Sequence, residues 1–87
     1  MTNSEIWNAI NDELRSAKKA HPIWPDHIAS RAGFVVEEAG ELMQAALEYK
    51  YEKGKKGRNR QQQIDQMKKE AVHTVVTAIR FLENLKQ

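Results

Sequence analysis

Cysteine is absent from the 87-residue chain, which excludes disulfide bonds and thiolate metal sites and favours a reducing, intracellular setting. No N-terminal stretch resembles a signal peptide. Long apolar runs are missing as well. The longest stretch without Asp, Glu, Lys or Arg is nine residues, 71–79, whereas a membrane-spanning helix needs roughly 20 residues. We therefore expect a soluble, cytoplasmic protein without a membrane partner.

Aromatic residues are scarce, at 7% of the chain, while 40% of the residues are hydrophobic and 30% are charged. This composition is globular in type, but a chain this short hides only roughly 60% of its unfolded surface on folding. The chain is long enough for a single domain, 1–87, and too short for a second. Because a single chain of this size can bury only a small hydrophobic core, we expect a second copy of the chain to complete the core.

The net charge of +2 is unevenly distributed. Six of the 14 basic residues and one of the 12 acidic residues lie in 50–60, so the other 76 residues hold eight basic residues against eleven acidic ones. An acidic body with one basic segment argues against nucleic acid as the partner. Two glycines and no apolar residue in 53–60 predict a mobile, solvated basic loop, and closure of this loop over a nucleotide's phosphates is the alternative.

Apolar residues recur every three or four positions in three segments, which predicts three helices. The first covers 3–20, with Ser4 as its cap. The second starts with Pro25 as its first residue and runs to about residue 51, and the third covers about 61–85.

No strand pattern appears, so the predicted fold is all-α, a short N-terminal helix followed by a long antiparallel helical hairpin. Its wide apolar faces would be buried best in a four-helix-type core formed on dimerisation. Gly33 and Gly40 each lower the helix propensity of the second helix by about 1 kcal/mol relative to alanine, which predicts close packing or a closely approaching ligand there.

Five side chains form a candidate metal site. Glu37, Glu38 and Glu41 share one polar arc of about 100° on the second helix, where like charges repel unless a cation neutralises them. Glu70 and His73 share a face of the third helix. Since Glu41 lies 12 residues before 53 and Glu70 lies 10 residues after 60, antiparallel packing places them at similar height. The predicted result is a site for a hard divalent cation, with an ordinary solvated acidic face as the alternative.

Trp24, Arg31 and Arg80 are the candidates for substrate binding. Trp24 could stack on a base, and the two arginines could contact phosphate. The competing interpretations are a hydrophobic anchor for Trp24 and surface ion pairs with glutamate for Arg31 and Arg80.

The string EEAGEL at 37–42, followed some thirty residues later by EAVH at 70–73, resembles the MazG-type all-α nucleotide pyrophosphohydrolases, with their phosphoribosyl-ATP pyrophosphatase and dimeric dUTPase relatives. The similarity covers 24–85. It implies a homodimer or dimer of dimers in which Glu37, Glu38, Glu41 and Glu70 hold Mg²⁺, or alternatively Mn²⁺, against the phosphates of a nucleoside triphosphate. Water then releases a monophosphate and pyrophosphate, and Glu37 or Glu38 is the catalytic candidate that orients or deprotonates this water.

His73 stands where that family has aspartate. Imidazole suits Zn²⁺, Fe²⁺ or Mn²⁺ better than Mg²⁺, so this position bears on metal preference and on activity. Glu-x-x-His on one helix with a glutamate on the other also matches the ligands of a ferritin-like di-iron half-bundle. A third hypothesis is a catalytically silent homologue that binds nucleotide or a protein partner. The adjacent pair Glu37 and Glu38 exceeds what a di-iron half-site needs and favours the pyrophosphohydrolase.

Overall fold

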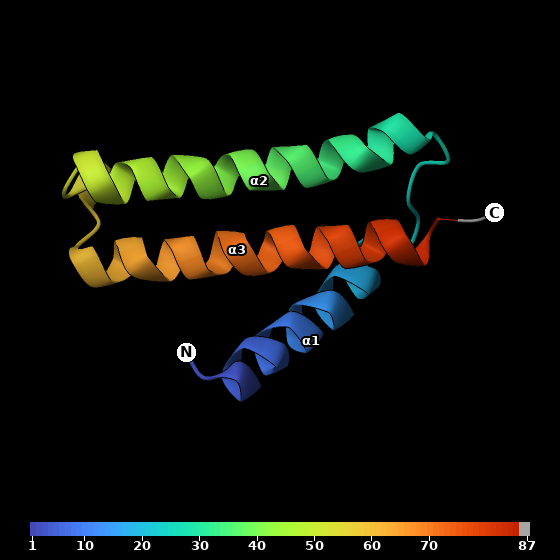
Figure 1. Ribbon diagram of the computed structural model, residues 1–87, viewed down its shortest axis with the longest axis horizontal. Helices are drawn as coiled ribbons and strands as arrows, with labels where there is room; N and C mark the ends of the chain where they lie inside the picture. Colours follow the sequence, from blue (N-terminus) through green and yellow to red (C-terminus); the bar gives the residue numbers. More distant parts are fainter. Residues whose placement is uncertain (86–87) are drawn as a thin grey trace.

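The computed structural model describes residues 1–85, which form three α-helices and one short 3-10 turn. The elements are α1 (Asn3–Ala20), α2 (Ile28–Tyr51), η1 (Lys55–Gly57) and α3 (Arg60–Glu83). α2 and α3 lie side by side as a long antiparallel hairpin, and α1 crosses α3 on the side away from α2 (Figure 1). No strand occurs within these residues, so the predicted all-α fold is confirmed. In the same residues, no helix has the length and apolar character needed to cross a membrane.

Side chains cap two of the three helices. The Thr2 hydroxyl accepts from the Glu5 N–H, and the Glu5 carboxylate accepts from the Thr2 N–H, both at 3.1 Å, whereas the predicted cap Ser4 lies inside α1. Asn59 and Gln62 make the same reciprocal pair at the start of α3, at 2.8 and 2.9 Å. Each pair satisfies two backbone donors that a helix N-terminus leaves free, which fixes where these helices begin.

α2 begins at Ile28, three residues after the predicted start, so the assignment of Pro25 to its first position is wrong. Two prolines within the preceding linker disfavour helical backbone at the residues before them. The non-helical linker also brings the Trp24 ring against Phe34, edge to face, with centroids 5.7 Å apart. Packing of Trp24 thus outweighs the preference of proline for a helix start.

Polar residues occupy much of the buried interior. Among residues 1–85, the buried apolar residues are Ile10, Ala45 and Val76, and the buried polar or charged ones are Glu48, Gln63, Glu70 and Arg80. Large apolar side chains lie at the surface instead, including Ile28, Val36, Met43, Leu47 and Leu82. The apolar faces predicted for the second and third helices are therefore only partly covered in the single chain.

Gly33 and Gly40 lie on the exposed side of α2. A Cβ added at either position would meet no atom within 4 Å. The close packing predicted at these glycines is therefore not made within the chain.

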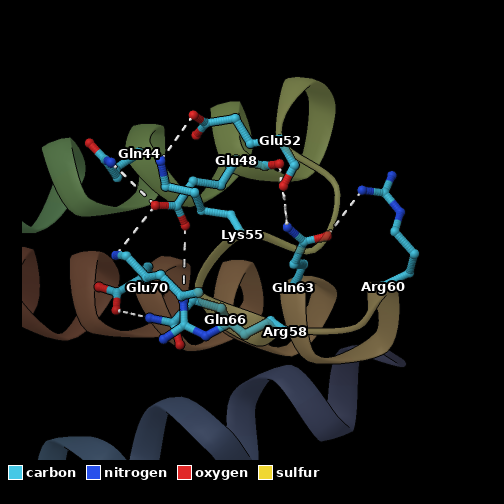
Figure 2. A network of polar contacts seen from close by, with 10 residues as sticks. Gln44, Glu48, Glu52, Lys55, Arg58, Arg60, Gln63, Gln66 and Glu70 are labelled. Atoms are coloured by element: carbon cyan, nitrogen blue, oxygen red, sulfur yellow. Dashed lines mark hydrogen bonds and ion pairs between the residues drawn. The ribbon is translucent and has the colours of Figure 1, made fainter.

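The basic loop 53–60 is folded back against the end of the hairpin. Most of it is exposed, and Lys56 takes a left-handed backbone conformation, φ +59°, which residues other than glycine adopt at a cost. Lys56 Nζ lies 3.3 Å from Oε1 of the buried Glu48, and Arg58 Nη1 lies 3.9 Å from Oε2 of the same carboxylate (Figure 2). Two cations of this loop thus turn inward.

Candidate metal centre

Three of the predicted ligands converge between α2 and α3. Glu38 on α2 and Glu70 and His73 on α3 each offer one ligand atom, and these atoms all lie within 4.8 Å of one another. Glu70 and His73 are three residues apart, so they project from the same side of α3. Two carboxylate oxygens and an imidazole nitrogen at this spacing form a donor set that suits a divalent cation such as Mn²⁺, Fe²⁺ or Zn²⁺.

Two oxygens of this group lack a partner. Oε2 of Glu38 and Oε2 of Glu70 are buried and accept no hydrogen bond from any residue in 1–85. The other oxygen of Glu70 accepts from Gln66 Nε2 at 2.7 Å (Figure 2), and the residue is only 6% exposed. Burying a carboxylate oxygen without a donor costs free energy, because water is lost and nothing replaces it. A cation between Glu38 and Glu70 would remove this cost, so the residues fit a metal ion.

The electrostatics of the group also favour a cation. Burial raises the pKa of Glu38, and the negative charges of Glu41, Glu70 and Glu37 raise it further, while His73 acts in the opposite direction. Burial likewise raises the pKa of Glu70, followed by its contact with the carboxylate of Glu41. Both carboxyl groups therefore hold their negative charge less readily than an exposed glutamate, and a bound cation would favour the ionised form.

The other two predicted ligands flank the group. Glu37 and Glu41 are exposed, and both raise the pKa of Glu38 through their charge. Glu41 contacts Glu70, as expected from their similar distances to the loop. The structure therefore brings three of the five predicted residues within ligand distance and leaves Glu37 and Glu41 at the rim.

Glu13 on α1 is a member of the site that the sequence analysis missed. Its Oε1 lies 3.4 Å from Nε2 of His73, while Oε2 of Glu38 lies 3.8 Å from Nδ1 of the same ring. His73 thus sits between two carboxylates, and Thr77 binds only its backbone carbonyl, at 2.7 Å. The available signal was a glutamate three residues after the apolar Ile10 of α1, on the side that packs against α3.

A cavity of about 520 Å³ adjoins this group. Its lining includes Glu38 and His73 of this group as well as Trp24, Phe34 and Arg80. The Arg80 guanidinium lies 4.9 Å from the centre of a Trp24 ring. Two of the three predicted substrate-binding residues therefore line the cavity next to the candidate metal ligands.

Arg80 makes no surface ion pair with glutamate, which corrects the competing interpretation of this residue. It is buried, donates to the carbonyls of Ala17 and His21, and so joins α3 to the end of α1. Burial lowers its pKa, with the nearby Glu83 opposing this.

Arg31 lies away from the metal group. Its guanidinium donates to the carbonyl of Asp26 at 3.1 Å and to the carbonyl of Asn84, so it ties the start of α2 to the end of α3. The alternative ion pair with glutamate is not found at this residue within 1–85, and the phosphate contact stays a prediction.

No family model matches the chain, and neither a curated protein nor a solved structure matches it. The resemblance to the MazG-type pyrophosphohydrolases rests on the segments 37–42 and 70–73, and the activity that it implies is a proposal.

Proposed function

We propose that the protein is a divalent-metal-dependent nucleotide pyrophosphohydrolase that cleaves a nucleoside triphosphate to a monophosphate and pyrophosphate. The observation that carries this proposal is the convergence of Glu38, Glu70 and His73, each with one ligand atom within 4.8 Å of the others, together with a buried, unpartnered oxygen on each of the two carboxylates. The space between these three side chains favours a cation on chemical grounds alone, independently of the motif resemblance.

Different residues of the site would bind the metal ion and activate the water. A bound Mg²⁺ or Mn²⁺ neutralises polyphosphate charge and makes water a better nucleophile. Glu38, Glu70 and His73 would hold the ion, which leaves Glu37, exposed at the rim of the cavity, to orient the attacking water and accept its proton. Water bonds to the α-phosphorus as the bond to the α–β bridging oxygen breaks, so pyrophosphate leaves with that oxygen.

The adjoining cavity offers a place for the nucleoside. Trp24 and Phe34 line it with aromatic rings, and base stacking on such rings contributes about 1–3 kcal/mol per base in other proteins. The Arg80 cation beside Trp24 adds positive charge to the lining.

We also propose that the working form is a homodimer or a dimer of dimers. The chain exposes 6332 Å², whereas a compact monomer of this mass exposes about 5,200 Å². The excess of about 1,100 Å² is close to the roughly 800 Å² that each partner buries in a typical interface.

One face of α2 suits this contact. Small or apolar exposed residues recur along it at alternating intervals of four and three residues. This is the heptad repeat of helices that pack against each other in a coiled coil. We call this face the α2 seam, and it consists of Ala29, Gly33, Val36, Gly40, Met43 and Leu47.

A ferritin-like di-iron half-bundle is the second candidate function. The group of one glutamate from α2 with Glu70 and His73 from α3 is half of the ligand set of such a centre, and a second chain would supply the other half.

Product analysis separates these candidates. The protein is incubated with a panel of nucleoside triphosphates and Mg²⁺ or Mn²⁺, and in parallel with Fe²⁺ and oxygen. Monophosphate plus pyrophosphate supports the proposal, and diphosphate plus phosphate points to another hydrolase. Iron oxidation without nucleotide turnover supports the di-iron centre, and binding without turnover indicates a silent homologue.

The Glu38→Gln/Glu70→Gln variant should be inactive, while Glu83→Gln, which changes an exposed glutamate paired with Lys18, should behave as wild type.

A further inference from the structure

A second cavity, of about 430 Å³, lies on the loop side of the metal group. Glu38 and His73 line the first cavity, Glu70 lines the second, and Glu37 lines both. The candidate metal ligands therefore lie between two spaces, and a ligand that binds the metal can extend into either of them.

The second cavity has walls of opposite charge. Its acidic wall is formed by the rim glutamates Glu37 and Glu41 with Glu70, whose buried Oε2 is unpartnered. Its basic wall is formed by Lys56 and Arg58 of the folded loop. Glu48 also lines this cavity, and Gln44 and Gln66 complete the polar lining.

Glu48 only partly neutralises the two cations. It is buried, and a hydrogen bond from Gln44, followed by Lys56 and Arg58, keeps its pKa below the ordinary value, so it carries one negative charge against two positive ones. The ion pairs with Glu48 leave both side chains within reach of a ligand: the Lys56 ammonium lies 3.3 Å from Oε1 of Glu48 but its side chain is half-exposed, and 3.9 Å is near the outer limit of an ion pair for Arg58. Hydrogen-bond donors on Lys56 and Arg58, and the one positive charge that Glu48 does not balance, therefore remain available to a ligand.

We propose that Lys56 and Arg58 form an anion subsite for the phosphate groups that leave as pyrophosphate. This proposal rests on the proposed function and extends it to the basic loop. Lysine and arginine bind phosphate oxygens through charge-assisted hydrogen bonds, which are about twice as strong as neutral ones. The nucleoside then occupies the Trp24 cavity, the reacting phosphate lies at the metal group, and the leaving phosphates lie in the second cavity.

The acidic wall imposes a condition on binding. A bare polyanion entering the second cavity meets four glutamates, Glu48 included, and only two cations, so it is repelled unless a divalent ion accompanies it. The same wall disfavours a nucleic-acid backbone as the ligand. The subsite therefore takes pyrophosphate as its metal complex.

Calorimetric titration with inorganic pyrophosphate, with and without Mg²⁺, tests this subsite. Lys56→Ala/Arg58→Ala should weaken metal-dependent binding by about tenfold or more, because two charge-assisted hydrogen bonds are lost. Lys53→Ala, in the same loop but outside the cavity, should stay within about twofold of wild type. Glu48→Gln should strengthen binding, since it removes the competing negative charge.

A further variant controls for folding, because the double alanine change leaves Glu48 buried without a counter-charge. Pyrophosphate binding is therefore also compared between Glu48→Gln and the triple variant that adds Lys56→Ala and Arg58→Ala. Residue 48 is then uncharged in both proteins, and the two alanine changes should weaken binding there as well.

Titration with Mg²⁺ alone separates the two proposals. Metal-dependent pyrophosphate binding that survives loss of Lys56 and Arg58 overturns the subsite and leaves the metal centre intact. Binding that needs the two cations but no metal supports the anion subsite and contradicts its requirement for a metal complex, and absence of Mg²⁺ binding in the titration with Mg²⁺ alone contradicts the metal centre. Absence of pyrophosphate binding overturns the subsite.

Discussion

Glu70 occupies the least favourable position for a bare charge in the described chain, because it is 6% exposed, has an unpartnered oxygen and contacts another glutamate. Gln66 holds its other oxygen. Such an arrangement lowers the stability of the protein without a cation. On the proposed function the same arrangement would hold a ligand ready for a metal ion, so function and stability would conflict at this residue.

Replacing Glu70 by glutamine should therefore stabilise the metal-free protein by about 1 kcal/mol, because the buried charge is removed and the amide oxygen can still accept from Gln66. Denaturant unfolding with a chelator present measures the change. Glu83→Gln, at an exposed ion pair, is the control and should change little. A loss of stability in the Glu70 variant would mean that its carboxylate has a partner that the account lacks.

The pH dependence follows from the raised pKa values of Glu38 and Glu70, whose ordinary value is 4.5. The folded state holds these protons more tightly than the unfolded state, so these groups favour folding most at low pH, and stability is lost as the pH rises through their raised pKa values. The pKa of Glu48 is shifted in the opposite direction, so its contribution to stability changes with pH in the opposite sense. Its lowered pKa gives stability that is present above pH 4.5 and is lost as the pH falls through that pKa.

With a chelator present, the melting temperature of the wild type should fall relative to that of Glu38→Gln/Glu70→Gln as the pH rises above 4.5. Glu13 and His73 are unchanged in the variant, so the difference between the two curves reports the two carboxylates. Parallel curves at all pH values would contradict the electrostatic account.

His73 links the metal centre to α1, because it lies between Glu13 and Glu38. His73→Asp adds an oxygen ligand and a negative charge, so it should strengthen Mg²⁺ binding and lower the stability of the metal-free protein. If the imidazole is a working ligand for a softer ion, the same change should weaken binding of Fe²⁺. Titration with each metal, with His27→Asp as an exposed control, measures both effects. An unchanged affinity for both metals would remove His73 from the ligand set.

At the scale of helices, periodicity predicted the number and type of elements, because each helix has a continuous apolar stripe. Similar distances from the loop predicted that Glu41 and Glu70 meet, because antiparallel helices advance equally per residue. The two capping boxes were readable as Thr2-x-x-Glu5 and Asn59-x-x-Gln62, although Ser4 was the predicted cap of the first helix and the third helix was predicted to begin one residue late.

Tertiary packing decided what local patterns left open. The start of α2 depends on how Trp24 packs against Phe34, and the place of Glu13 depends on the crossing of α1 over α3. Neither the linker nor a single helix pattern contains this information. The inward turn of Lys56 depends likewise on the distant Glu48.

The α2 seam gives a prediction with two opposite readouts. Gly40→Ala should stabilise the single chain by about 1 kcal/mol, because alanine favours helix and the added methyl group meets no atom within the chain. The same methyl group should weaken close packing between two copies. Light scattering should show a larger monomer fraction for Gly40→Ala than for wild type, whose mass should be at least twice the 10.0 kDa of one chain. A monomeric wild type would refute the seam.

At the scale of the whole molecule, the single chain is elongated, with extents of 45 × 28 × 20 Å. Its radius of gyration is 14.4 Å, against about 12 Å for a compact domain of this length. The long hairpin has a polar site between its helices and open apolar side chains on α2, so it has the form of half a bundle (Figure 1). Gly40 belongs to the α2 seam and also lines the second cavity, so assembly and chemistry would use adjoining faces of α2.

The central claim is that Glu38 and Glu70 bind a divalent cation, and electron paramagnetic resonance of free Mn²⁺ during a titration tests it most directly. Wild type and Glu83→Gln should each bind Mn²⁺ saturably, at one ion or more per chain, and Glu38→Gln/Glu70→Gln should lose at least one of these ions per chain. Equal stoichiometry and affinity in all three proteins would contradict the account, because the buried carboxylate oxygens would then have no part in binding the metal.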